Sequence, residues 1–397
     1  MKVKLTFPAE VIAEQTADGL QLPPIAVGME PVDDRLETLT ALYWQQAATY
    51  AAAHLAEWVP RVANSFDIAY YFASEWHDGI HVYWELSNSV QIPADVRDAS
   101  LAFARSMADV GLSRACLNPP AGLKGYRGYN RGIRELALDP RVPIADQARY
   151  NAIATNIALY TDYFNPANIT PKHEYWPKAW QGSAYGREFS LGVLAHLYAD
   201  FGVRSNVAQA STEYVDNVVR LLLLGRYWPW WFEVLQAGYQ ALPVGTTSFE
   251  GRSGYIDPPG CYHEFLPFIL AHSARALIAV YDRGIISDRA IPAYLTDVAD
   301  LMWQHCYRVD PQTGATGLFY RANGQRTERP APDLSMLIMP WYAWLWRRYG
   351  QLRFKDRALE LLRSGLEHAW LAGPKQFNQS FLWSHEGLSW LAWEPPK

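Results

Sequence analysis

The sequence predicts an all-α fold, an (α/α) toroid in which about six or seven antiparallel helix pairs form a closed or incomplete barrel. Three observations favour this class. Apolar residues recur with helical spacing along most of the chain, and strand-like alternation is confined to short pieces. The segment 265–281 is apolar on nearly every face while 353–371 is strongly amphipathic, a mixture typical of two concentric layers. Long glycine- and aromatic-rich intervals suit a toroid with short connections at one rim and long loops at the other.

The predicted helices follow one another along the whole chain. The first keeps Tyr43, Ala47 and Tyr50 on one face, and the last ends before Gly373 and Pro374, which stop helices. No Pro/Ser-rich linker and no close sequence repeat is visible, so a single domain is expected over 1–397. In order, the helices cover about 33–58, 94–112, 146–164, 183–201, 206–224, 229–242, 264–281, 291–307, 333–349 and 353–371.

Two short β-hairpins are predicted as appendages on this helical body. The first covers 66–86, where aromatic and β-branched residues flank an Asp78-Gly79 turn signal. The second lies around 314–326 and contains an Asn-Gly pair.

Composition excludes several classes of protein. The 397 residues carry 35 Lys and Arg against 40 Asp and Glu, and the net charge of −5 argues against a general nucleic-acid or anionic-membrane surface. Aromatic residues make up 14% of the chain, which is neither disordered nor fibrous. The N-terminus lacks the apolar core of a signal peptide and no apolar run could span a membrane. The protein is therefore expected to be cytoplasmic, or secreted with its leader removed.

No cofactor or metal is expected. The three cysteines have no CxxC spacing, and nucleotide-binding and nucleophile-elbow motifs are absent from the sequence. His77 and His81 are separated by a turn signal instead of lying on one helix, which argues against zinc. The sequence leaves the oligomeric state open.

The segment 246–265 carries the strongest indication of chemistry. Three glycines and two prolines exclude regular structure, and a helix is expected to begin near His263. At a helix N-terminus the dipole disfavours the imidazolium, so His263 would be neutral and able to accept a proton. Tyr255 and Tyr262 add phenols to this segment, and Glu250 and Arg252 add charge. The competing interpretation is that His263 caps the helix and the tyrosines pack beneath the loop.

A second cluster lies at 317–326. Tyr320 and Arg321 precede the Asn-Gly pair, and Arg326 follows it, so one turn would present a phenol and guanidinium groups suited to binding carboxylates. A solvated basic turn is the alternative.

Aromatic loops provide candidate platforms for sugars. Trp176 and Trp180 precede a predicted helix that carries Arg187 in its first turns, and indole rings stack on the apolar faces of pyranoses. Arg127 lies in a further basic aromatic loop that could bind acidic sugar units. Packing residues and a surface turn are the competing interpretations.

The segment leading into Tyr262-His263-Glu264-Phe265 and the Tyr320-Arg321 turn give the chain a resemblance to the polysaccharide lyases built on (α/α) toroids, which act on alginate, glucuronan and glycosaminoglycans. The resemblance in architecture covers most of the chain. The Asn-Asn-His-Ser-Tyr-Trp pattern of one alginate-lyase group is absent, and the most similar segment is His173-Glu174-Tyr175-Trp176. That departure leaves the carboxylate-neutralising residue open.

The resemblance implies β-elimination on an acidic polysaccharide or oligosaccharide that contains uronic acid. This reaction needs a group that neutralises the C6 carboxylate, a base for the C5 proton and an acid for the C4 glycosidic oxygen. His263 is the candidate base, or the residue that orients a tyrosine. Tyr320 or Tyr255 would transfer the proton. Arg252 or Arg321 would pair with the carboxylate, and a protonated Glu250 could also bond to it.

The sequence leaves two alternatives to a lyase open. A glycoside hydrolase on the same toroid would need two carboxylates about 5–5.5 Å apart for retention or about 6.5–9.5 Å apart for inversion. Glu188, Glu250, Asp257 and Glu264 are available for such a pair. The other alternative is a non-catalytic carbohydrate-binding helical protein.

Overall fold

The computed structural model confirms a mainly α-helical protein. It describes residues 34–62, 79–112, 131–159, 228, 232, 235–236, 267–284, 286–320, 329–369 and 374–393. The helices among these residues are α1 (Arg35–Val62), α3 (Gly79–Asn88), α4 (Ala94–Met107), the π-helical turn η2 (Ala108–Leu112), α6 (Arg131–Leu138), α7 (Ile144–Leu159), α11 (Pro267–Asp282), α12 (Ala290–Cys306), α13 (Pro332–Tyr349), α14 (Leu352–His368) and α15 (Pro374–Leu391). The strands are β1 (Tyr307–Val309) and β2 (Thr316–Leu318).

Helical periodicity located many of these elements correctly. The predictions over 33–58, 94–112, 291–307, 333–349 and 353–371 correspond to α1, α4 with η2, α12, α13 and α14. Three helices were not predicted, namely α3, α6 and α15. The predictions over 183–201 and 206–224 lie outside the described residues, and the described part of 229–242, residues 232 and 235–236, is helical.

The predicted β-hairpin over 66–86 is wrong in its second half, because residues from Gly79 onward form α3. The run Ile80 to Tyr83 is buried on every side, with α4, α6 and α15 packed around the helix. A short continuous apolar run of this kind fits a buried strand and a buried helix equally well, and tertiary burial decides between them.

The second hairpin was predicted around 314–326, and its part from 321 onward, with the Asn-Gly pair, lies outside the described residues. The hairpin that the structure shows precedes it. β1 pairs with β2 in antiparallel register, with Tyr307 opposite Leu318 and Val309 opposite Thr316. The intervening turn includes Gly314 at a φ of 72°, a left-handed conformation that favours glycine. Beyond β2, Phe319 forms an isolated antiparallel bridge with Pro330.

The core is centred on α13, which is buried all round. Every residue from Leu334 to Trp346 is buried. α14 buries a single face, and Gly365 allows α14 to approach α13, since a Cβ at Gly365 would lie 2.2 Å from the sulfur of Met336. α13 is thus an enclosed helix, and α14, in direct contact with it, is a half-exposed one.

The helices α11, α13 and α15 point in the same direction. α13, α14 and α15 follow one another through short connections, 350–351 and 369–373. α14 is therefore antiparallel to α13, and α15 is again parallel to α13. α11 is parallel to α13, because Phe268 near its start stacks on Tyr320, just ahead of α13, while Asp282 at its end bonds to Trp344 near the end of α13. The N-terminal ends of the three helices therefore lie at the same end of the molecule.

A structural repeat with a period of fifty residues links the hairpin of α3 and α4 to the hairpin of α6 and α7. Helix, five-residue turn and helix occur in the same order, and Asp139 of the second turn takes the place of Ser89 in the first. The same backbone hydrogen bond forms in each turn. The Ile92 N–H donates to the Ser89 carbonyl, and the Val142 N–H donates to the Asp139 carbonyl, both at 3.0 Å. Few residues are identical between the two hairpins, which explains why no repeat is visible in the sequence.

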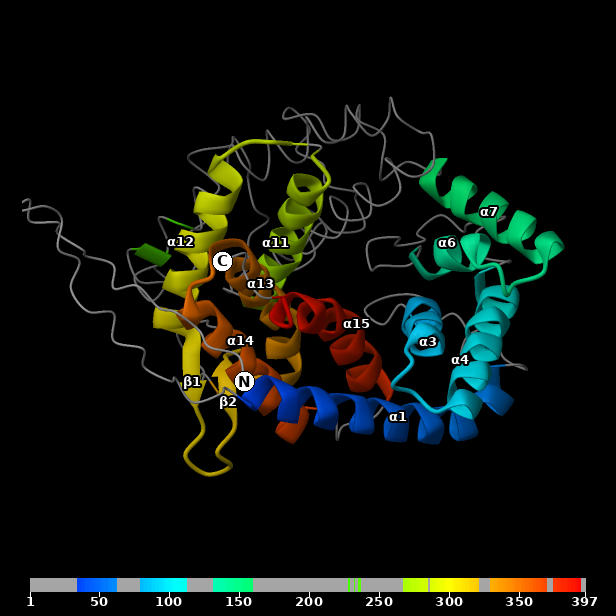
Figure 1. Ribbon diagram of the computed structural model, residues 1–397, viewed down its shortest axis with the longest axis horizontal. Coiled ribbons are helices and arrows are strands. Elements are labelled where there is room, and N and C mark those ends of the chain that lie inside the picture. Colours follow the sequence, from blue (N-terminus) through cyan, green and yellow to red (C-terminus); the bar gives the residue numbers. More distant parts are fainter. Residues whose placement is uncertain are drawn as a thin grey trace, which may run out of the picture.

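The two ends of the described chain meet in the structure. Figure 1 shows α1 along one side of the molecule, where it packs against α14 and α15 from the C-terminal part and against α4 from the N-terminal part. α1 and α15 are antiparallel, since Tyr43 contacts Phe381 while His54, further along α1, contacts the earlier Phe377. In addition, α11, α13, α15, α3 and α6 form a row in which each helix contacts the next.

Candidate functional site

Tyr320 is the predicted site residue that falls within the described part of the chain. Its ring stacks on Phe268 of α11, with ring centroids 5.7 Å apart and planes inclined by 23°, and 41% of the residue is exposed. The other predicted site residues lie outside the described residues: His263, Tyr255, Arg321, Glu250, Arg252, Tyr262, Arg187, Trp176, Trp180, Arg127 and Arg326.

The position of Tyr320 is set by the hairpin that precedes it. The Leu318 backbone N–H donates a bond of 3.1 Å to Ser335 Oγ of α13. Gly317 permits this approach, because a Cβ there would lie 2.5 Å from Ser335 Oγ and its φ is 142°. On the other side of the hairpin, the Thr316 hydroxyl donates to Glu360 of α14 at 2.6 Å. Tyr320 thus follows directly after a hairpin that is hydrogen-bonded to both α13 and α14.

The first turns of α15 contain buried polar groups that were not predicted from the sequence. Asn378 and Ser380 are fully buried, and Gln379 is 3% exposed. Within the described residues, both polar atoms of the Asn378 amide, the Gln379 Nε2 and the Ser380 Oγ have no hydrogen-bond partner. Buried polar atoms in native proteins are almost always bonded, so a group of four such atoms on three consecutive residues requires an explanation.

A charged pair lies further along α15. The guanidinium of Arg275, from α11, bonds to the carboxylate of Glu386 at 2.6 Å and lies over the ring of Trp383, 4.3 Å from its centroid. Arg275 is 4% exposed. Gln379, Trp383 and Glu386 are spaced so that they share one face of α15, which places an amide, an indole and a carboxylate in a strip that faces α11.

The opposite side of α15 packs against α1 through aromatic rings. The His54 ring lies edge-on to Phe377 at 5.2 Å and near Tyr50 at 6.2 Å. Burial lowers the pKa of His54, although the charge of Glu57 acts in the opposite direction. The Tyr43 phenol donates to the Phe381 carbonyl and accepts from Ser384, and burial raises its pKa well above its usual value. This interface holds α15 in place and keeps His54 neutral.

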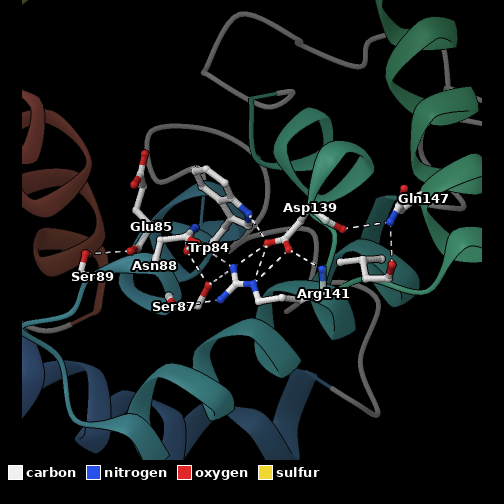
Figure 2. A network of polar contacts seen from close by, with 9 residues as sticks. Trp84, Glu85, Ser87, Asn88, Ser89, Asp139, Arg141 and Gln147 are labelled. Carbon is white, nitrogen blue, oxygen red and sulfur yellow. Dashed lines mark hydrogen bonds and ion pairs between the residues drawn. The ribbon is translucent and has the colours of Figure 1, made fainter.

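A separate polar network joins the two repeated hairpins (Figure 2). Arg141, in the turn after α6, bonds to the carboxylate of Asp139 and reaches the Ser87 carbonyl at 3.0 Å and Asn88 at 2.9 Å, at the end of α3. The Trp84 indole N–H also donates to Asp139 at 2.9 Å. Burial opposes ionisation of Asp139, but the bonds from Arg141 and Trp84 outweigh it and hold its pKa below the usual value.

Beside this network lies a cavity of about 570 Å³, lined in part by Trp84, Arg97, Asp98 and Arg141. The Arg141 guanidinium donates its hydrogen bonds to protein acceptors, and the Asp139 carboxylate accepts hydrogen bonds from Arg141 and Trp84. We therefore interpret the network as a clamp that holds the two hairpins together. The Arg141 guanidinium donates to the Ser87 carbonyl at the C-terminal end of α3, where a positive charge is favoured.

Within the described residues, no group of three or more His, Cys, Asp or Glu side chains is arranged to hold a metal ion. The helices of this part of the chain include none that is both long and apolar enough to cross a membrane. Comparisons with models of protein families, with curated proteins and with solved structures found no match to the chain.

Proposed function

We propose that the protein is a polysaccharide lyase built on an (α/α) toroid, which cleaves a uronic-acid-containing polysaccharide of the alginate or glucuronan type by β-elimination. The stacking of Tyr320 on Phe268 is the observation that carries this proposal. It connects the two sequence segments that carry the candidate catalytic residues, since Tyr320 belongs to 317–326 and Phe268 closely follows 246–265.

Chain length limits how far apart the two clusters can be. His263 precedes Phe268 by five residues, so their Cα atoms can be no more than about 18 Å apart. Arg321 directly follows Tyr320. This limit permits the base and the guanidinium to lie near the Tyr320 phenol, as the proposal requires.

These groups match the three tasks of β-elimination. His263 would take the C5 proton, and the electron pair of that C–H bond forms the C4–C5 double bond. The C4–O bond then breaks, and the Tyr320 phenol gives its proton to the leaving glycosidic oxygen. Arg321 or Arg252 pairs with the C6 carboxylate and so stabilises the charge that develops during proton removal.

Helix direction supports an acidic substrate. α11, α13 and α15 have their N-terminal ends at the same end of the molecule, which is the end where Tyr320 lies. Each helix N-terminus carries a partial positive charge, and three in parallel favour a carboxylate there. A net charge of −5 for the whole chain does not oppose this, because a substrate responds to the local field.

The toroid is supported by the row of helices α11, α13, α15, α3 and α6, which brings together helices from both ends of the chain. α13, α3 and α6 are each followed by an antiparallel partner after a short connection, and α1 occupies the partner position beside α15. This alternation of a row helix and an outer helix is the pattern of an (α/α) toroid.

The proposal is tested by incubating the purified protein with alginate, glucuronan, hyaluronan, pectate and a neutral glucan. Elimination produces ultraviolet absorbance from the unsaturated uronate together with new reducing ends. New reducing ends without absorbance would contradict the lyase and indicate the hydrolase with a carboxylate pair. Oligosaccharide binding without cleavage of any substrate would indicate the non-catalytic alternative.

A matched pair of variants tests the role of Tyr320. Tyr320→Phe removes the phenol and keeps the ring on Phe268, so it should lower turnover at least about a hundredfold, the usual contribution of a positioned acid. Tyr349 has a similar exposure of 40% but lies at the opposite end of α13, and Tyr349→Phe should leave turnover unchanged. Equal turnover in both variants would remove Tyr320 from the mechanism.

A further inference from the structure

The cavity of about 570 Å³ lies where the hairpin of α3 and α4 meets the hairpin of α6 and α7. α3 contributes Trp84 to its lining, α4 contributes Arg97 and Asp98, and α6 contributes Glu135 and Leu138. The volume falls within the range of about 300–1,000 Å³ that is usual for small-molecule sites. The clamp between the hairpins forms part of the wall, but Arg97 and Asp98 take no part in the clamp.

The structural repeat shows that Arg97 is not needed by its own turn. Arg97 occupies the position in the first hairpin that Gln147 occupies in the second. The Gln147 amide folds back onto its turn and donates to the carbonyls of Asp139 at 3.0 Å and Val142 at 2.7 Å. Within the described residues, the Arg97 guanidinium has no such bond and no ion pair, and it lines the cavity instead. A guanidinium binds a carboxylate through two parallel hydrogen bonds, so Arg97 offers the cavity a site for an anionic group.

An acidic group without a partner lies directly beside this arginine. Asp98 also has no ion pair within the described residues, and neighbouring positions on a helix do not face each other, which explains why Arg97 and Asp98 do not pair. The lining as a whole contains two arginines and three carboxylates and so carries one net negative charge. A purely anionic ligand would be repelled by these carboxylates, and a purely cationic one by Arg97. A ligand with both charges satisfies both groups.

Trp84 offers a surface for the positive end of such a ligand. Its indole N–H donates to Asp139 at 2.9 Å, and its ring stacks on His81 with centroids 5.9 Å apart, so the orientation of the ring at the cavity wall is fixed. An ammonium group is attracted to the negative face of an indole, and nearby carboxylates add to this attraction. Leu138 is 57% exposed and provides apolar surface at the same cavity.

We propose that this cavity binds a small zwitterion, of which an α-amino acid is the simplest. Its carboxylate pairs with Arg97, and its ammonium group lies beside Asp98 and the Trp84 ring. The site goes beyond the proposed lyase activity and uses none of the residues assigned to β-elimination. Because the walls come from two hairpins, a bound ligand stabilises the junction between them.

The test measures binding to the full-length protein by isothermal titration calorimetry. The probes are leucine, lysine and glutamate, followed by the amide and the N-acetyl derivative of whichever amino acid binds most tightly. The amide lacks the carboxylate and the N-acetyl derivative lacks the ammonium group. Arg97→Met and Asp98→Asn remove the two protein partners. Arg289→Met is the matched control, because Arg289 is an exposed arginine at the start of α12.

At least one of the three amino acids should bind with a dissociation constant of about 1 mM or lower. Arg97→Met and Asp98→Asn should each weaken this binding by about tenfold or more, and both blocked derivatives should bind the wild-type protein more weakly by a similar factor. Arg289→Met should leave affinity unchanged. The midpoint of thermal unfolding without ligand should stay close to that of the wild type in all three variants, since none of them touches the clamp.

Three results would overturn the proposal. The first is that none of the three amino acids binds. The second is that a blocked derivative binds as tightly as the free amino acid, since one charge would then be sufficient. The third is that Arg97→Met binds as tightly as the wild type, which would place the ligand elsewhere. The blocked derivatives test the same contacts in the wild-type protein, so the outcome does not depend on whether the variants fold. Cleavage of polysaccharides is measured separately, and its presence or absence leaves these results unchanged.

Discussion

The hydroxyl of Ser384 donates a hydrogen bond of 3.1 Å to the phenol of Tyr43, so that two residues 341 positions apart share one buried polar contact. The phenol in turn donates to the Phe381 carbonyl. This bonded chain joins α1 to α15. The packing of α1 therefore fixes the orientation of α15.

Removal of the Tyr43 hydroxyl should weaken this junction. We expect Tyr43→Phe to lower the free energy of unfolding by about 1–2 kcal/mol, since it removes a buried hydrogen-bonding group and keeps the ring. Urea denaturation followed by circular dichroism measures the change. Tyr349→Phe, on an exposed tyrosine, is the control and should have an effect close to zero. Equal midpoints for the two variants would show that the hydroxyl contributes nothing.

Removal of the clamp between the hairpins should be more costly. Arg141→Met leaves the carboxylate of Asp139, whose side chain is 2% exposed, without its main partner, and we expect a loss of about 2–3 kcal/mol. Arg97 lines the same cavity and forms no ion pair within the described residues, so Arg97→Met should cost much less. Similar unfolding midpoints for Arg141→Met and the wild type would contradict the clamp.

The same carboxylate should make stability depend on pH in the acid range. The pKa of Asp139 is lower in the folded protein than its usual value of 3.8, so the unfolded chain binds a proton first as the pH falls. The stabilisation is complete above that value and decreases as the pH falls through the folded pKa. Asp139→Asn should therefore flatten the unfolding free energy below about pH 4. An unchanged slope in this variant would exclude Asp139 as the source.

His54 should affect stability at a higher pH. Burial lowers its pKa in the folded state, so the unfolded chain takes up a proton first as the pH falls below the usual value of 6.5. Stability is complete above that value and decreases toward acid. His54→Leu should reduce the loss of unfolding free energy between about pH 7 and pH 5. Thermal unfolding across this range measures the effect, and parallel curves for wild type and His54→Leu would contradict it.

Gly132 should be irreplaceable where α6 meets α3. A Cβ at this position would lie 2.3 Å from the backbone nitrogen of His81 and 2.7 Å from the carbonyl carbon of Ile80, so backbone atoms would have to move. We expect Gly132→Ala to cost about 2–3 kcal/mol, in the range of overpacked cores. Gly284→Ala tests backbone conformation alone, because Gly284 has a φ of 67° and open space around it, and should cost about 1 kcal/mol. If the two costs are equal, the close approach is not what requires glycine.

The sequence identified the helices whose apolar residues follow a single face. α1, α4, α12 and α14 were predicted close to their observed bounds because burial and helical period agree in them. α13 is buried all round and was still predicted, because its apolar run is as long as a helix. The run Ile80 to Tyr83 of α3 was mistaken for a strand because it is buried on every side and too short for its period to distinguish the two structures. α6 has eight residues, too few for a clear pattern.

α15 was missed for a physical reason. Asn378, Gln379 and Ser380 are buried, yet polar residues count as exposed in any periodicity argument. Their burial depends on tertiary packing and is not visible in the sequence. Tyr320 was selected because a phenol next to arginines ahead of a turn is a local pattern, and its role stays a prediction.

The junction of α1 with α15 has a consequence for the synthesis of the protein. The partners of Tyr43 on α15, Phe381 and Ser384, leave the ribosome more than three hundred residues after Tyr43 itself. At 5–20 residues per second this delay is roughly 20–70 s, during which Tyr43 lacks its contacts with α15. The nascent chain therefore exposes this part of α1 for that interval, and we expect its yield in cells to depend on chaperones that shield such segments.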